Sequence, residues 1–347
     1  MAYTTIKKST EHFNTKLYTG NGSTQSITGV GFQPDFVWLK QRSSGVYYHR
    51  LQDSIRGAGK PIYSNRTDAE GDFGTGTTGS IRTFDTDGFS IGSDTGSNEN
   101  NTTMVSWNWK ANGTGSSNTD GSITSTVSAN TTNGFSIVSY TGNETTGATV
   151  GHGLSSTPKM IILKNRNSTD DWVVYHESLG NTQSIRLNLI NASATTPASF
   201  NNTSPTSSVF TLGDWTAVNG SSMIAYCFAD VKGFSKFGSY TGNGNADGTF
   251  VYTGFKPAFI MVKPSSIGNE AWKLYDNKRN IFNVVENGLN ASDSQVEGSG
   301  SGNYIDFLSN GFKLRTNDTR QNGSGATNIY MAFAEEPLVG DNPATAR

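Results

Sequence analysis

The sequence predicts an all-β protein made of three tandem antiparallel β-sandwich repeats of jelly-roll-like type. Three observations predict this fold class. One tetrapeptide occurs three times with similar surroundings, the apolar runs are short and bounded by turn residues, and no window of a dozen residues shows a convincing helical period. A chain of 347 residues has room for two or three domains. We therefore expect several cores.

The composition favours strands and turns and excludes two classes of protein. Charged residues make up 16% of the chain, against about 25% in an average soluble domain. Aromatic residues reach 11%, which a disordered chain would lack. The net charge is −2, so no strongly basic face is forced. We expect no nucleic-acid partner.

The repeated tetrapeptide begins each predicted repeat. A Phe lies five or six residues before its Tyr, a Pro follows that Tyr by 16 to 18 residues, and a Lys stands six residues beyond the Pro. The Lys closes an apolar run in which polar and apolar residues do not alternate, and this predicts a strand covered on both faces. The Lys is expected at the solvent-exposed end of that strand. The tetrapeptides are Tyr18-Thr19-Gly20-Asn21, Tyr140-Thr141-Gly142-Asn143 and Tyr240-Thr241-Gly242-Asn243, and the lysines are Lys40, Lys164 and Lys263.

Two later features complete each predicted repeat. An aromatic pair comes first, and a second aromatic run, predicted to be the closing strand, ends the repeat. From the first Tyr to the last aromatic residue the three spans are 91, 88 and 93 residues, which favours copies of one unit over coincidence. The pairs are Tyr47 with Tyr48, Trp172 with Tyr175, and Trp272 with Tyr275; the closing runs are 104–109, 223–228 and 329–333.

These landmarks predict the domain boundaries. Residues 1–113 hold repeat 1 with an N-terminal arm, 132–232 hold repeat 2, and 233–347 hold repeat 3 with a C-terminal tail. Residues 114–131 are rich in Gly and Ser and predict a flexible linker. Repeats 2 and 3 have no linker and should abut. The middle of each repeat shares no sequence with the others and predicts variable surface loops, at 64–80, 191–208 and 290–303.

Neither a membrane span nor a secretion signal is expected. The longest apolar runs are far shorter than the ~18 residues of a spanning helix, and the first eight residues lack an apolar region. The single cysteine, Cys227, lies in an apolar run and is expected in the core. We expect the chain to fold in a reducing cytoplasm.

No motif predicts a catalytic, metal-binding or cofactor-binding residue. The run Gly57-Ala58-Gly59-Lys60 lacks the flanking Gly and Ser or Thr of a phosphate loop. The run Asp85-Thr86-Asp87-Gly88 resembles the start of a calcium loop, but position 96 is Gly, so a hairpin turn is favoured. We therefore expect no cofactor, no metal and no enzymatic activity.

The histidines do not have the spacing of zinc ligands. His49 and His176 each follow a Tyr, and Asp276 stands in the corresponding place of the third repeat. Because the residue type changes between copies, this position is expected to be a tolerated surface site. The four histidines are His12, His49, His152 and His176.

The recurrent aromatic residues allow two interpretations. An aromatic face complements the apolar face of a sugar ring, so Trp172, Tyr175, Trp272 and Tyr275 are candidate glycan contacts. Recurrence at matching positions is also what a shared core requires, and packing is the favoured interpretation. Any glycan site is then expected in the unshared loops.

The frame from Tyr18 to Trp38, with the later segments Phe84–Ser90 and Trp107–Ala111, resembles a repeat found in virion proteins of tailed bacteriophages, particularly phages of marine bacteria. Such proteins are described as tail-fibre-like or structural. The first repeat fits best and the others fit more loosely. The resemblance implies a place on a phage particle and carries over no catalytic residue.

The sequence thus leads to the hypothesis of a non-enzymatic structural protein of a virion, in a tail fibre or another tail-attached appendage, made in the host cytoplasm. Other virion proteins are the expected partners, and a homo-oligomer, with a trimer favoured, is expected because virion appendages obey closed symmetry. Three alternatives stay open: a head decoration protein on the capsid, a carbohydrate-binding adhesin for a host surface glycan, and a depolymerase acting on that glycan.

Overall fold

The structure is a computed structural model that describes residues 4–337. It is 39% strand and 7% helix, and its sheets are antiparallel, so the predicted all-β class is confirmed. Among the described residues no helix is long and apolar enough to cross a membrane. The predicted C-terminal tail from residue 338, and residues 1–3 of the predicted arm, lie outside the described residues.

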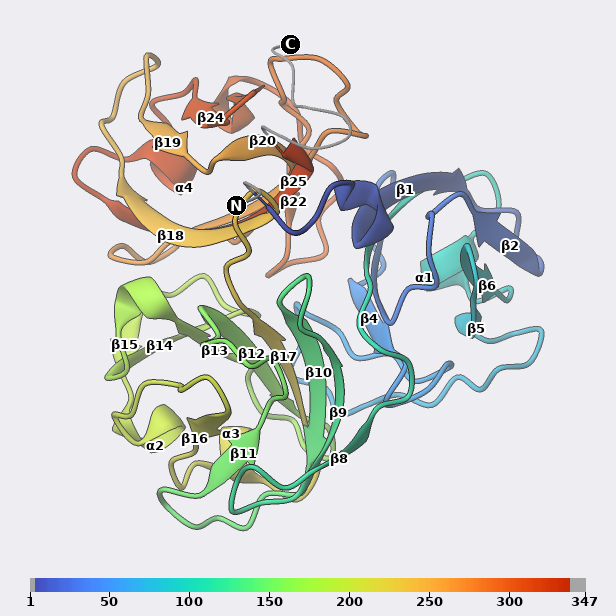
Figure 1. The fold of residues 1–347 in the computed structure, drawn as a ribbon. Coiled ribbons are helices and arrows are strands. Elements are labelled where there is room, and N and C mark those ends of the chain that lie inside the picture. Colours follow the sequence, from blue (N-terminus) through green and yellow to red (C-terminus); the bar gives the residue numbers. More distant parts are fainter. Residues whose placement is uncertain (1–3, 338–347) are drawn as a thin grey trace.

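The chain forms three lobes around a common centre (Figure 1). We call residues 4–113, 114–232 and 233–337 the first, second and third segments. Each has one large sheet, in which the segment's closing strand lies between an early strand and the strand that carries the apolar run beside the recurrent Pro. The orders are β1-β7-β3-β4 in the first segment, β15-β14-β13-β12-β17-β10-β9-β8 in the second and β18-β25-β20-β21-β22 in the third.

The strands of the large sheets have the following bounds. In the first segment they are β1 (Phe13–Thr19), β3 (Phe36–Gln41), β4 (Arg50–Asp53) and β7 (Thr103–Trp109). In the second they are β8 (Ser116–Asn118), β9 (Ser125–Asn130), β10 (Phe135–Tyr140), β12 (Met160–Asn165), β13 (Val173–His176), β14 (Gln183–Arg186), β15 (Ala194–Thr195) and β17 (Met223–Phe228). In the third they are β18 (Ser235–Thr241), β20 (Phe255–Pro264), β21 (Lys273–Asp276), β22 (Leu289–Asn290) and β25 (Thr327–Pro337).

A smaller sheet covers the outer face of each large one. In the first segment Phe89 of the small sheet packs with Val37 and Leu39 of β3 in one apolar cluster. The small sheets contain β2 (Gln25–Thr28), β5 (Ile81–Asp85) and β6 (Gly88–Ile91); β11 (Thr149–Gly151) and β16 (Val209–Thr211); and β19 (Phe250–Tyr252), β23 (Ile305–Leu308) and β24 (Gly311–Leu314). The helices are α1 (Thr95–Asn98), α2 (Pro197–Phe200), α3 (Thr216–Asn219), α4 (Thr319–Asn322), η1 (Ser9–Glu11), η2 (Glu177–Leu179) and η3 (Ser301–Asn303).

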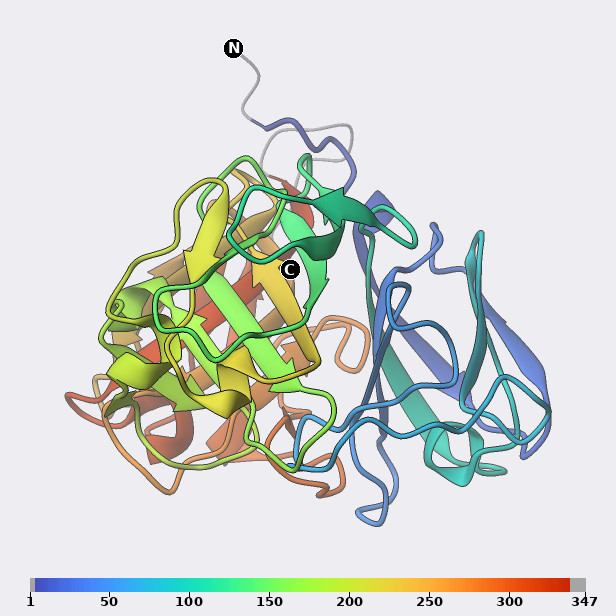
Figure 2. The same cartoon turned by 90° about the horizontal axis from the view of Figure 1, so that it is seen from below.

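The predicted flexible linker at 114–131 is wrong. Strands β8 and β9 lie in it and extend the large sheet of the second segment, with Val127 opposite Val138. Ile123 and Val127 are buried in the core of that segment. Figure 2 shows these teal strands packed beside the green ones. The Gly and Ser residues occupy turns and an edge strand, where small polar side chains meet solvent.

The inner faces of the three large sheets pack against one another in one central core. The register puts Trp109, Phe228 and Phe333 at equivalent positions, opposite Phe36, Met160 and Phe259. Their ring centroids lie 6.4 Å apart for Trp109 and Phe228, 6.1 Å for Phe228 and Phe333, and 5.7 Å for Trp109 and Phe333. We call these three residues the central ring cluster. Strands β3, β12 and β20 are therefore buried on both faces, as their poor alternation predicts.

The repeated tetrapeptide holds one end of each large sheet to a short helix. The Tyr hydroxyl donates to the main chain of that helix: Tyr18 to Ser97 O, Tyr140 to Val218 O and Tyr240 to Gln321 O. The next residue of each helix is a buried Asn, whose side-chain oxygen accepts the backbone N–H of the tetrapeptide Asn. These buried residues are Asn98, Asn219 and Asn322.

The Gly of the tetrapeptide is required by close approach. A Cβ on Gly20 would lie 2.1 Å from the carbonyl oxygen of Glu99, and one on Gly242 would lie 2.3 Å from that of Gly323. Both distances are far inside van der Waals contact. Contacts in the structure thus explain the Tyr, the Gly and the Asn of the tetrapeptide, but not the Thr.

We predict that Asn322→Ala lowers the free energy of unfolding by about 2 to 3 kcal/mol, because it leaves buried groups without partners. Its side-chain amide donates to Asn243 Oδ1, Asn245 O and Thr316 O at 2.7 to 2.9 Å. Urea unfolding measures the loss. The exposed Asn100→Ala is the control and should change the value by less than about 0.5 kcal/mol. Equal losses of stability in the two variants would contradict the structural role given to the buried Asn322 side chain.

Candidate functional site

The four candidate glycan contacts are core residues. Trp172, Tyr175, Trp272 and Tyr275 are at most 3% exposed. The indole N–H of Trp172 donates to Tyr63 O of the first segment, and that of Trp272 donates to Arg186 O of the second, both at 2.8 Å. The structure therefore agrees with the packing interpretation. None of the four presents a ring face to a ligand in solution.

The expected surface position of the histidines is wrong. His49, His176 and Asp276 are at most 1% exposed. The strand register also changes the correspondence: Asp53, opposite Phe36, is the counterpart of His176 and Asp276, which lie opposite Met160 and Phe259. His49 instead precedes the strand, as Trp172 and Trp272 do. The pair Tyr47-Tyr48 does not correspond to the other two pairs, because β4 begins only at Arg50, whereas β13 and β21 contain Tyr175 and Tyr275.

The three corresponding residues each bind the next segment. Asp53 accepts the hydroxyl of Tyr226 at 2.8 Å, and Asp276 accepts the indole N–H of Trp107 at 3.0 Å. His176 Nε2 lies 3.1 Å from Tyr330 O. Burial lowers the pKa of His176 to about 4, so its ring is neutral near pH 7 and donates through Nε2. The first segment thus contacts the second, the second the third, and the third the first.

Two of these junctions carry the same buried ionic cluster. At the first, Arg56 binds Asp53 and Glu70, and Arg166 of the second segment binds Glu70 at 2.8 Å. Burial acts to lower the pKa of Arg56, but the charge of Asp53 and its neighbours outweighs it and the net pKa is raised. Every charge is therefore compensated. At the junction of the third and first segments the same contacts join Asp276, Arg279, Glu297 and Arg42.

A backbone hydrogen bond recurs at all three junctions. Glu70 N donates to Arg166 O, Ser193 N to Ser265 O, and Glu297 N to Arg42 O, at 2.8 to 2.9 Å. Where the second and third segments meet, serines replace the Arg–Glu pair, and the Ser193 hydroxyl also donates to Ser265 O. The backbone geometry is thus kept while the side-chain chemistry changes.

The recurrent lysines are buried, so their predicted solvent-exposed position is wrong. Lys40, Lys164 and Lys263 have exposed fractions of 0%. The ammonium of Lys164 donates to Thr67 O of the first segment, and that of Lys263 to Ile190 O of the second, both at 3.0 Å. Burial lowers the pKa of each lysine to about 8, and carbonyl oxygens surround each charge. Each lysine holds the loops around its strand end together.

Two observations concern metal-binding groups and the single thiol in the described part of the chain. No group of three or more His, Cys, Asp or Glu residues there is placed to hold a metal ion. Cys227 is buried, and burial raises the pKa of its thiol. A thiol that stays protonated is a poor nucleophile.

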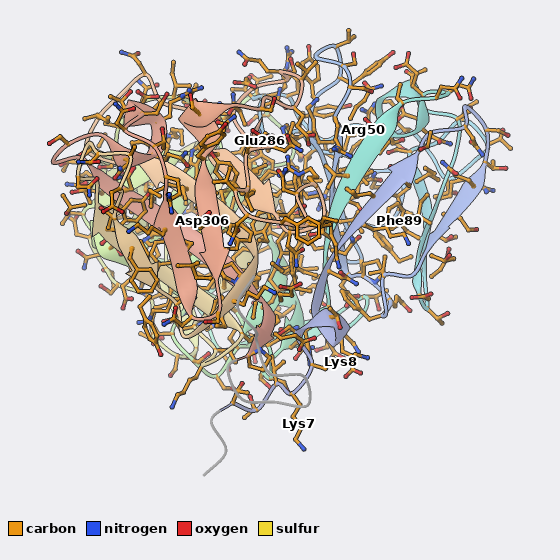
Figure 3. The ribbon with its side chains drawn as sticks, turned by 90° about the horizontal axis from the view of Figure 1, so that it is seen from above. Lys7, Lys8, Arg50, Phe89, Glu286 and Asp306 are labelled. Atoms are coloured by element: carbon orange, nitrogen blue, oxygen red, sulfur yellow. The ribbon has the colours of Figure 1, made fainter. Side chains whose placement is uncertain are left out.

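A polar cavity in the third segment is the strongest candidate for a ligand site. It has a volume of about 370 Å³. Its lining includes Lys273 of β21, Asn290 of β22, the loop 295–303 and Arg320 of α4. We call it the Lys273 cavity. Figure 3 shows the side chains of the same lobe, with Glu286 and Asp306 labelled, and those of the first lobe, with Arg50 and Phe89 labelled.

A larger depression, of about 540 Å³, offers a weaker site. It is lined by Asp230, Lys236 and Tyr252, among others. Lys236 is already paired with Asp230 at 2.5 Å. Its charges are therefore satisfied within the protein.

We predict that Lys164→Met lowers the free energy of unfolding by about 3 kcal/mol, because buried carbonyl groups lose a charged donor. Thermal and urea unfolding measure the loss. The matched control is Lys159→Met, which removes only a surface ion pair with Glu177 and should cost less than about 1 kcal/mol. The carbonyl groups around Lys164 belong to Thr67, Asn165, Ser168 and Asp170.

The same variant should also change how the free energy of unfolding depends on pH. The pKa of Lys164 falls from 10.5 to about 8 on folding, so above pH 8 the unfolded state binds more protons than the folded state. Stability of the natural protein should therefore rise between pH 8 and about 9.5, below the range where tyrosines of the unfolded chain ionise. Lys164→Met should reduce that rise. A fall in the stability of the natural protein across this window would contradict the assignment.

Comparison with known proteins gives a family for this fold. None of the curated proteins compared with the chain matches it. A family model described as "Domain of unknown function (DUF7483)" matches residues 8–337. That range contains all three segments and the junctions between them. The chain therefore belongs to the DUF7483 family.

Proposed function

We propose that this chain is a non-enzymatic structural protein of a tailed-phage virion, located in a tail fibre or another tail-attached appendage. The observation that carries the proposal is the closed set of junctions, in which each segment has buried hydrogen bonds to both of the others. Such a chain is a stiff building block. The sequence that begins at Tyr18 resembles virion proteins, and this resemblance supports the proposal that the block belongs to a phage particle.

We infer further that the segments are three copies of one β-sandwich unit. The support is positional: the tetrapeptide, the buried lysine, the buried Asn and the central ring occupy equivalent places in each large sheet. Each large sheet also has its own small sheet on the outer face. Copies of one unit account for these correspondences with a single ancestral fold.

The placement of ionisable groups supports a structural role over catalysis. His49 and His176 are buried, as are the Asp–Arg pairs of two junctions. The charges of these Asp–Arg pairs and both ring nitrogens of His176 are used in contacts inside the protein. The abundant Asn, Thr and Ser have a hydration that is insensitive to salt, which suits a particle exposed to sea water.

Other virion proteins are the proposed partners, and we keep the proposal of a homo-oligomer, with a trimer favoured. Light scattering of the purified chain gives its mass directly. A head decoration protein and a glycan-binding adhesin are the competing functions. Of these, an adhesin needs a site other than the four buried aromatic residues.

The proposal predicts that the chain is a stoichiometric component of phage particles. Particles are purified from a culture whose DNA encodes the chain, and quantitative mass spectrometry gives its copy number. On the order of tens of copies per particle, with antibody labelling at the tail, is the expected result for an appendage of closed symmetry. Hundreds of copies on the head would transfer the role to capsid decoration, and absence from the particles would overturn it.

A further inference from the structure

The third segment holds a largely buried lysine beside a cavity, and its ammonium group has no hydrogen-bonding partner within the described protein. Lys273 is 5% exposed, yet its Nζ takes part in no hydrogen bond or ion pair among residues 4–337. The buried Lys40, Lys164 and Lys263 differ, because each donates to carbonyl oxygens. A buried charge without a partner is costly, so a retained one indicates a missing counter-group.

The first segment shows what such a partner looks like. Arg50 is the counterpart of Lys273 in the strand register, and it pairs with Asp94 at 2.9 Å. Asp318 precedes α4 as Asp94 precedes α1, but both of its oxygens already accept from Arg320. Lys273 is therefore left without the carboxylate that its counterpart uses. The second segment has Val173 at this position and needs none.

The cavity beside Lys273 is cationic and otherwise lined by polar groups. Lys273 and Arg320 are the charged residues of its lining. The nearby carboxylates lie outside the lining and have donors of their own: Thr319 for Glu270, Asn290 for Asp293 and Arg320 for Asp318. Both cations line the cavity; Arg320 keeps its ion pair with Asp318, and Lys273 is the cation without a carboxylate partner.

A second unpartnered atom lines the same cavity. Asn290 Oδ1 is buried and accepts no hydrogen bond. It offers a place for a hydroxyl or amide donor of a ligand. Gly302 also lines the cavity, and a Cβ there would come within 2.0 Å of Arg320 Nη2. The absence of a side chain there lets the guanidinium reach the cavity.

We propose that the Lys273 cavity binds a monosaccharide-sized, hydroxyl-rich anion, that is, a sugar carrying one carboxylate or one phosphate group. Lys273 and Arg320 receive the anionic group, and Asn290 with the serines and amides of loop 295–303 receives the hydroxyls. The volume of about 370 Å³ falls at the lower end of the range for small-molecule sites. The site occurs once per chain, and it does not depend on the function proposed above.

Burial lowers the pKa of Lys273 to about 8, so the group is mostly an ammonium at neutral pH. That value already includes the positive charge of Arg320, which also lowers the pKa, and the charges of Asp293, Asp318 and Glu270, which raise it. An anion bound in the cavity would stabilise the ammonium.

Calorimetric titration of the full chain tests the proposal with four probes: glucuronate, glucose 6-phosphate, glucose and inorganic phosphate. We expect one site, and binding of at least one acidic sugar about tenfold or more tighter than binding of glucose, since a charge-assisted contact contributes about 1.5 to 3 kcal/mol. Which acidic sugar binds more tightly identifies the anionic group. Equal affinity for glucose would show that the cations play no part, and preference for inorganic phosphate over both acidic sugars would remove the role of the hydroxyl groups; either result overturns the proposal.

Two variants assign the binding to this cavity. Lys273→Met should weaken binding of the acidic sugar about tenfold or more. Lys313→Met is the matched control in the same segment: its lysine forms a surface pair with Asp247, does not line the cavity and should leave binding unchanged.

A labelling experiment on the natural protein covers the case in which Lys273→Met fails to fold. Amine-reactive trace labelling, read by mass spectrometry, reports the access to each lysine. The acidic sugar that binds should protect Lys273 and leave Lys313 unchanged. No protection of Lys273 at saturation, or affinities for both acidic sugars weaker than about 10 mM, would contradict the proposal.

Discussion

The packing of Trp109, Phe228 and Phe333 against one another is the contact on which the rest of the structure depends. Each ring comes from the closing strand of a different segment. The large sheet behind each ring is apolar on both faces, and only the outer face is covered by its own small sheet. A segment on its own would expose its inner face to water. The hydrophobic effect therefore joins the three segments into one body.

Apolar packing alone is not directional, and the buried polar groups supply the direction. A buried carboxylate needs donors for its oxygens. Asp53 and Asp276 each pair with an arginine of their own segment and take a further donor from the neighbouring segment. Tyr226 and Trp107 meet that requirement at only one relative position of the segments. At the remaining junction the neutral ring of His176 donates to a backbone carbonyl instead. Different chemistry thus specifies the same arrangement three times.

The sequence predicts much of the fold because strand positions depend on local pattern. The strands that carry the apolar runs beside the recurrent Pro, and the closing strands, occur where the apolar runs place them. The linker was mispredicted because a Gly- and Ser-rich edge strand such as β8 has the composition of a loop. The buried lysines were mispredicted because a Lys that ends an apolar run looks solvent-exposed until the carbonyl groups from another segment are known.

The candidate site was beyond sequence reasoning for a related reason. Lys273 occupies the strand position of Arg50, and the match appears only in the strand register, because the Arg50–Asp94 pair joins residues far apart in the sequence. The partners of the tetrapeptide, such as Asn322, lie about eighty residues away in a chain rich in Asn. The sequence predicts only that residues 290–303 form a surface loop not shared with the other repeats. Part of that loop lines the cavity.

The three segments share one core and should therefore fold and unfold together. Differential scanning calorimetry of the full chain tests this most directly. One transition is expected, with the calorimetric enthalpy equal to the van't Hoff enthalpy. Two or three separable transitions, each with its own enthalpy, would show that the segments are independently stable and would contradict the account.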